Sequence, residues 1–138
     1  MTDAVHISLS GMQAQKKRLL SSAANIANLT TSGAGPQNPP PDAPEVFRPL
    51  STAQKAVVTG SGSGAGVSAQ ITQAENGTTL VFDPSSPFAD ENGMIAVPEI
   101  SLEKEIVNLL LTKNAYKANA LALKTAAETE KELLNTLA

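Results

Sequence analysis

Hydrophobic residues in the last third of the chain recur in alternating steps of three and four. From residue 101 onward this heptad pattern contains no glycine or proline, and only Lys113 and Glu130 interrupt it. Such a pattern predicts one long α-helix with an apolar stripe along it, and Ser101 is a suitable N-cap. The positions of the stripe are Leu102, Ile106, Leu109, Lys113, Tyr116, Ala120, Leu123, Ala127, Glu130, Leu134 and Leu137.

The stripe is wider than pairing with one helix requires, because Leu110, Leu121 and Leu133 extend it onto neighbouring faces. A helix with several apolar faces needs several neighbours. A helix of about 36 residues would also span roughly 54 Å. A compact domain of this chain length is only about 37 Å across. We therefore expect part of the apolar surface to be covered from outside the chain.

Residues 3–31 repeat the same pattern near the N-terminus and predict a second helix. Gly11 weakens its first turns by about 1 kcal/mol relative to alanine, and Gly33 is a plausible stop. The stepping positions of this helix are Val5, Leu9, Met12, Lys16, Leu19, Ala23, Ile26 and Thr30.

The segment between the helices is rich in residues that break regular structure. Residues 33–44 carry so many prolines and glycines that they predict a loop. Residues 60–66 alternate glycine with small residues and predict a flexible connector. Residues 83–99 contain several turn signals and are expected to be irregular.

Short strands are expected around these loops. Residues 46–50 and 56–59 are extended candidates, and residues 67–73 alternate apolar with polar side chains. Asn76-Gly77 is a strong turn signal. The sequence therefore predicts a hairpin in which residues 78–82 return against residues 67–73.

The predicted fold class is mainly α with a small β-rich insert. The long N- and C-terminal helices are expected to pair as a coiled coil, with short strands, a hairpin and Pro/Gly-rich loops between them. This divides the chain into an N-terminal heptad helix (1–32), a linker and β-rich middle segment (33–100) and a C-terminal heptad helix (101–138).

Composition excludes several classes of protein. The chain has no cysteine, so disulfides and thiolate metal sites are ruled out. Its net charge of −3 argues against non-specific nucleic-acid binding. No apolar run is long enough to cross a bilayer. The basic cluster at residues 16–18 follows the first apolar positions, so a cleavable secretion signal is not expected.

Residues that could carry catalysis or bind a metal are few. His6 is the only histidine and has no obvious partner, so we predict no catalytic residues and no cofactor. Asp90, Asn92, Gly93 and Glu99 fall on four positions of a calcium-binding EF-hand loop, but Phe88 occupies the first position and cannot ligate. A plain acidic turn is the favoured interpretation, and we predict no metal site.

Three stretches resemble a known protein family. Residues 22–33 read Ser-Ala-Ala-Asn-Ile-Ala-Asn-Leu-Thr-Thr-Ser-Gly, and residues 114–119 read Asn-Ala-Tyr-Lys-Ala-Asn. Both are similar to signatures in the terminal helices of bacterial flagellar rod and hook proteins. Residues 82–98 read Phe-Asp-Pro-Ser-Ser-Pro-Phe-Ala-Asp-Glu-Asn-Gly-Met-Ile-Ala-Val-Pro. This stretch resembles the flagellar basal-body rod family and, within it, the proximal rod.

The resemblance implies a structural subunit rather than an enzyme. Such proteins pass through the flagellar type III export apparatus without a cleavable signal peptide and form the basal-body rod that crosses the periplasm. The implied partners are other copies of the chain, other rod proteins and the export apparatus, with no nucleic acid and no direct membrane insertion. The alternative is a helical adaptor or export-chaperone-like module, which would form a closed complex rather than a polymer.

An assembly interface is expected along the apolar stripes of both helices. Asn25 and Asn28 either fix the register against a neighbour or end the first helix, and the sequence leaves both readings open. The predicted interface residues are Leu9, Met12, Leu19, Asn25, Ile26, Asn28, Ile106, Leu109, Tyr116, Asn119, Leu123, Leu134 and Leu137.

Overall fold

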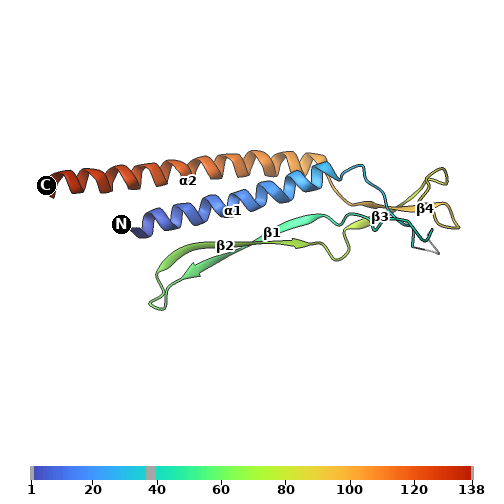
Figure 1. Ribbon diagram of the computed structural model, residues 1–138, viewed down its shortest axis with the longest axis horizontal. Helices are drawn as coiled ribbons and strands as arrows, with labels where there is room; N and C mark the ends of the chain where they lie inside the picture. The colour runs from blue at the N-terminus through green and yellow to red at the C-terminus, as the bar shows by residue number, and fades with distance from the viewer. Residues whose placement is uncertain (1, 37–39, 138) are drawn as a thin grey trace. The chain divides into compact units, whose positions relative to one another are not determined.

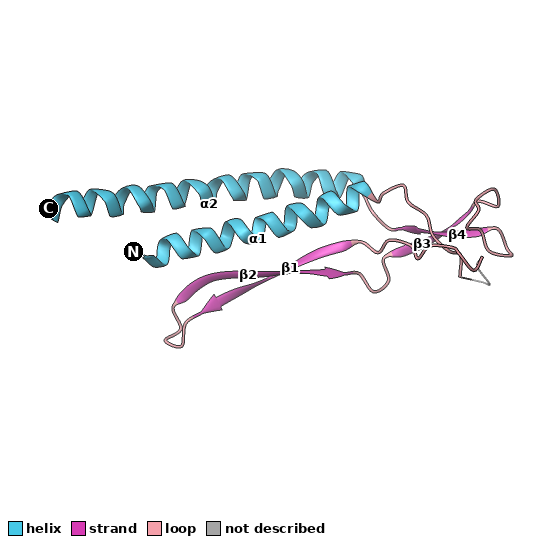
Figure 2. Cartoon of the chain, in the orientation of Figure 1, coloured by secondary structure: helices cyan, strands magenta, loops and turns pink. Residues whose placement is uncertain are grey.

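A computed structural model describes residues 2–36 and 40–137, and over these residues it contains two helices and four strands (Figure 2). Residues 37–39 of the predicted Pro/Gly-rich loop lie outside the described residues. The prediction of a mainly helical chain with a small β-rich insert is confirmed. In chain order the elements are α1 (Thr2–Ala27), β1 (Leu50–Val58), β2 (Gly64–Gln73), β3 (Thr78–Phe82), β4 (Met94–Pro98) and α2 (Leu102–Leu137).

The chain divides into two compact units. The first unit consists of residues 1–20, 52–71 and 107–138, and the second consists of residues 21–51 and 72–106. Each helix contributes residues to both units, and so do strands β1 and β2.

In the first unit, α1 and α2 lie side by side and run antiparallel (Figure 1). Gly11 permits the helices to approach closely, since a Cβ at this position would lie 2.5 Å from Asn119 Oδ1. Strand β2 is tied to α1 by two hydrogen bonds. Val67 N donates to Ser10 Oγ at 3.1 Å, and Lys17 Nζ donates to the Ala69 carbonyl at 2.5 Å. Small and polar residues therefore provide contacts between the elements of this unit.

In the second unit, β3 and β4 form an antiparallel two-stranded sheet whose register runs from Thr78 opposite Pro98 to Phe82 opposite Met94. Gly33 forms an isolated bridge with Ala96 of β4, donating to its carbonyl at 2.9 Å. The buried apolar side chains Ile95 and Ala96 lie in this strand. The unit's small apolar core is therefore centred on β4.

The predicted hairpin between residues 67–73 and 78–82 is wrong. Strand β2 pairs with β1, and β3 pairs with β4, so the two segments belong to different sheets. Gly77 does not adopt the left-handed conformation that a tight Asn-Gly hairpin turn requires. Instead, its carbonyl accepts from Glu99 N at 2.8 Å.

The glycine-rich tract of residues 60–66 is not simply a flexible connector. Thr59 N donates to Ser63 O at 2.8 Å and Gly62 N donates to Thr59 O at 2.9 Å, which closes the turn between β1 and β2. Gly62 adopts φ +82°, a conformation that favours glycine. The tract therefore supplies a specific turn and the first residues of β2.

Helix α2 confirms its prediction, whereas α1 ends earlier than expected. Ser101 Oγ accepts from Lys104 N at 3.2 Å, as an N-cap does. Helix α1 was expected to continue to residue 31 but ends at Ala27. Asn28 Nδ2 donates to the Ala24 carbonyl at 2.9 Å, and Thr31 Oγ1 donates to the Asn28 carbonyl at 2.8 Å. Such local side-chain bonds compete with helical ones and end the helix.

Candidate assembly interface

The faces of the two helices that are buried inside the chain are small and polar. Where α1 and α2 meet in the first unit, Gly11 lies against Asn119, and in the second unit Asn25 bonds to Glu105. These contacts do not confirm the expected coiled-coil pairing of the two helices, which remains a prediction. The buried residues are Ser8, Gly11, Ala14, Gln15, Ser21, Ser22 and Asn25 on α1, and Glu105 and Thr112 on α2.

Many of the large apolar side chains of both helices are instead exposed. Leu134 is 68% exposed and Leu137 is 84% exposed. An apolar stripe that its own chain leaves uncovered marks an interaction surface. The exposed apolar residues are Ile7, Leu9, Leu19 and Leu20 on α1, and Leu102, Ile106, Val107, Leu110, Leu111, Tyr116, Leu121, Leu133, Leu134 and Leu137 on α2.

The predicted interface residues fall into three groups. They are not brought together at one point but follow the two helices. Their role between subunits remains a prediction, because one chain carries no partner. Leu9, Leu19, Ile106, Tyr116, Leu134 and Leu137 are exposed, Met12, Ile26, Asn28, Leu109, Asn119 and Leu123 are half-buried, and Asn25 is buried.

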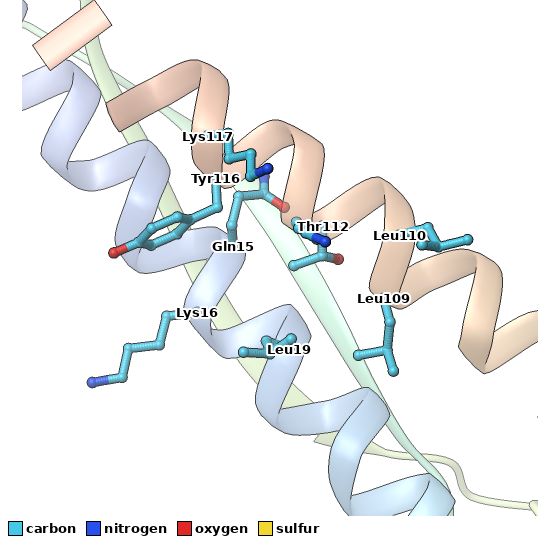
Figure 3. A pocket seen from close by; sticks show the side chains of 9 residues that line it. Gln15, Lys16, Leu19, Leu109, Leu110, Thr112, Tyr116 and Lys117 are labelled. Carbon is cyan, nitrogen blue, oxygen red and sulfur yellow. The ribbon is translucent and has the colours of Figure 1, made fainter. Parts of the chain in front are cut away.

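A groove of about 730 Å³ opens between the two helices in the first unit (Figure 3). Leu19 from α1 and Leu109 from α2 face each other within it, and Tyr116 reaches across α1. Thr112 is 2% exposed, and its hydroxyl has no hydrogen-bond partner among the described residues. The full lining is Gln15, Lys16, Leu19, Leu109, Leu110, Thr112, Lys113, Tyr116 and Lys117.

The charged residues that line the groove are all lysines. Lys16, Lys113 and Lys117 are exposed, and none of them forms an ion pair within the part of the chain that the structure describes. The groove thus combines an apolar floor with a basic rim. From the sequence, Lys113 was interpreted only as an interruption of the apolar stripe. The groove could not be predicted, because its lining depends on which residues of α1 lie opposite α2.

In the second unit, Asn25 joins three elements. It is 2% exposed, its Nδ2 donates to the Leu50 carbonyl at 2.9 Å and to Glu105 Oε1 at 2.8 Å, and its Oδ1 accepts from Leu50 N at 2.7 Å. We call these three bonds the Asn25 clasp. All three bonds are directed within the chain, and a register role of Asn25 toward a neighbouring subunit remains a prediction. For Asn28 the helix-ending interpretation applies.

The acidic stretch after β3 forms a turn. Asp90 Oδ1 accepts from Asn92 N and from Met94 N, both at 2.9 Å, and Gly93 adopts φ +73°. These bonds are those of a carboxylate that stabilises a tight turn. Among the described residues, no group of three histidine, aspartate or glutamate side chains is placed to hold a metal ion.

The first turn of α2 contains a glutamate, Glu103, whose pKa is shifted. A backbone hydrogen bond, followed in strength by the hydrogen bond from Ser101 Oγ at 2.9 Å, lowers the pKa of Glu103 below 4.5. The lowered pKa fits a carboxylate at a helix N-terminus, where exposed N–H groups favour negative charge.

Comparison with known proteins gives a consistent result. The chain is 34% identical to the flagellar basal-body rod protein FlgC of Yersinia enterocolitica over 128 residues, which covers 93% of this chain and 89% of that protein. It is 32% identical to FlgC of Salmonella typhimurium over 116 residues, covering 84% and 82%. It is 28% identical to FlgC of Bacillus subtilis over 130 residues, covering 86% of each. No family model matches the chain. Among the described residues, neither helix is both long and apolar enough to span a bilayer.

Proposed function

This chain belongs to the family of the flagellar basal-body rod protein FlgC, and from that premise we propose that it assembles through the outward apolar faces of α1 and α2. It is a structural subunit of the flagellar basal-body rod. Its partners in the proposal are further copies of itself and other rod proteins. Export through the flagellar type III apparatus is part of the same proposal.

One observation carries the proposal. Within the chain, the two helices use small and polar residues such as Gly11, Asn25 and Asn119 to contact neighbouring elements. Most of their large apolar side chains remain exposed. In a self-sufficient globular protein the larger apolar residues would face inward. The inverted arrangement is expected of a subunit whose core is completed by its neighbours.

The free energy available from burying the exposed leucines is large enough for stable association. Fully burying one leucine side chain contributes about 1.5–3 kcal/mol. Association costs on the order of 4–15 kcal/mol in lost freedom of motion. Burial of five exposed leucines contributes about 7.5–15 kcal/mol, which is comparable to that cost, whereas burial of one contributes less than its lower end. This favours extensive contact along both helices, as in a polymer, over capture of a single partner helix by an adaptor.

Assembly can be tested in a flagellated bacterium that lacks its own homologue and expresses this chain. Leu20→Asp and Leu121→Asp each place a charge on an outward helical face without altering a buried contact. Each should abolish swimming and remove the chain from purified basal bodies, while secretion of the chain continues. Val58→Asp, at a similarly exposed valine of β1, is the matched control and should preserve motility.

The same experiment separates the two candidate functions. A rod subunit is found in purified basal bodies in multiple copies, whereas an adaptor is absent from them and copurifies with one partner in a fixed ratio. Normal rods built from both leucine variants would contradict the proposed interface.

A further inference from the structure

Helix α2 extends beyond its partner in the first unit. Gly11 of α1 lies against Asn119 of α2, and the helices run antiparallel. Counting the same number of residues along each helix from this contact brings Thr2, the first residue of α1, level with Glu128. Residues 128–137 of α2, which we call the C-terminal overhang, therefore project past α1 by about 14 Å (Figure 1).

The overhang carries an apolar stripe with acidic residues in and beside it: Glu130 lies on the same face as Leu134 and Leu137, and Glu128 pairs with Lys124 at 3.7 Å. It carries Leu133, Leu134 and Leu137, all exposed, at the spacing of one helical face. Among its charged residues, three glutamates, Glu128, Glu130 and Glu132, outnumber the single Lys131. The last turn of α2 contains no basic residue, so the negative end of the helix dipole is uncompensated there.

The groove described above is the chemical complement of the overhang. Leu19, Leu109 and Tyr116 form its apolar part, and the lysines 16, 113 and 117 surround them. Apolar anchors at helical spacing that enter a groove of opposite charge are a common mode of helix recognition. The groove follows α2 from Leu109 to Lys117, roughly 12 Å, which matches the roughly 10 Å from Glu130 to Leu137.

We propose that the lysine-rimmed groove of one copy binds the C-terminal overhang of α2 from a second copy of the chain. The overhang cannot reach its own groove, because Leu134 and Tyr116 belong to the same continuous helix and lie about 27 Å apart along it. Groove and overhang are different surfaces, so the contact is head-to-tail and leaves one of each free. Such heterologous contacts close into rings or extend into helical assemblies.

This inference rests on the proposed function and specifies which surfaces meet. Charge reversal tests it in the purified protein. The groove variant is Lys113→Glu with Lys117→Glu, and the overhang variant is Glu130→Lys with Glu132→Lys. Each should weaken self-association in sedimentation velocity at low salt by roughly tenfold, since several exposed ion pairs are lost together. Combining all four changes in one chain should restore association to within about threefold of the original.

Two controls keep the test decisive. Lys55→Glu with Lys104→Glu reverses two exposed lysines outside the groove and should leave association unchanged. Because the chain has no cysteine, Leu19→Cys in one copy and Leu134→Cys in another should form a mixed disulfide on mild oxidation. Far-UV circular dichroism confirms that each variant retains its helices.

The outcomes distinguish this inference from the function it rests on. Equal weakening by the control pair, no restoration in the fourfold variant, or no self-association at any concentration overturns the groove–overhang contact. If the groove variant nevertheless enters rods normally, the proposed function stands and another rod protein occupies the groove. If the unaltered chain fails to enter rods, the proposed function itself fails.

Discussion

The Asn25 clasp gives the sharpest test of how the chain holds its own helices. Replacing Asn25 with leucine keeps the branched shape and the number of side-chain heavy atoms but removes all three hydrogen bonds. The Leu50 N–H and carbonyl lose their partner, and the buried Glu105 carboxylate loses one donor. The terminal part of α1 then loses its link to both β1 and α2 within the second unit.

The size of the effect follows from the number and kind of the bonds. A neutral hydrogen bond contributes about 0.5–1.5 kcal/mol, and one to a charged group contributes about 1.5–3 kcal/mol. Two neutral bonds and one charge-assisted bond therefore account for a decrease of roughly 2.5–6 kcal/mol in the free energy of unfolding. Domains of this size are stable by only about 5–15 kcal/mol in total.

Asn28→Leu is the matched control. Asn28 lies directly after the end of α1, and among the described residues its side chain bonds to the nearby Ala24 carbonyl and to no other element. We expect its effect on the free energy of unfolding to stay below about 1 kcal/mol. Urea unfolding of the purified variants, followed by far-UV circular dichroism, measures both. An Asn25→Leu variant no less stable than Asn28→Leu would refute the clasp.

Three further changes test other contacts by the same unfolding measurement. Gly11→Ala should lower the free energy of unfolding by about 1–2 kcal/mol, although alanine has the better helix propensity, because the new methyl group meets Asn119. In an Asn119→Ala background the same substitution should instead raise the free energy of unfolding. Thr112→Val removes a buried hydroxyl that lacks a partner and should stabilise by about 1 kcal/mol; a loss of stability would show that the hydroxyl is bonded. Ser101→Ala should raise the pKa of Glu103 toward 4.5 and cost about 1 kcal/mol of helix capping. Since the pKa of Glu103 is lowered in the folded chain, the ionised carboxylate stabilises the fold above pH 4.5, and this stabilisation is lost as the pH falls through the lowered pKa. Carbon-detected NMR titration of the Glu103 carboxyl measures that pKa directly.

The helices were predictable because their signals are local and strong. Helix α2 has 36 residues without a glycine or proline, and its cap at Ser101 is a short-range feature. The premature end of α1 depends on the side chains of Asn28 and Thr31 bonding to nearby carbonyls. The spacing of apolar residues along the chain does not reveal such bonds.

Strand pairing was harder because it depends on long-range contacts. Asn76-Gly77 is a strong turn signal, yet Ala74 N donates to the Pro49 carbonyl at 2.9 Å and Gly77 O accepts from Glu99. These bonds carry the chain from one sheet to the next rather than back on itself. Strand β4, Met94–Pro98, was predicted as irregular, because its neighbouring turn residues hid a short apolar run.

The candidate interface was predictable in composition but not in orientation. Heptad spacing identified residues such as Leu9, Leu19 and Ile106, which the structure leaves exposed. The spacing could not show that small and polar residues form the contacts of the helices inside the chain. Periodicity identifies an apolar face of a helix but not the element that packs against it. The anchors Ser10 and Lys17, which hold β2, were missed because their acceptor and donor lie more than fifty residues away.

Chemical labelling of single cysteines tests the central claim most directly, because the chain contains none of its own. Leu20→Cys and Leu110→Cys place a thiol on the outward faces of α1 and α2, and Ser61→Cys places one in the β1–β2 turn. All three should react rapidly with a maleimide in the free protein. In purified basal bodies, the two helical thiols should become protected while the turn thiol still reacts. Equal labelling of all three thiols in intact basal bodies would contradict assembly through the outward helical faces.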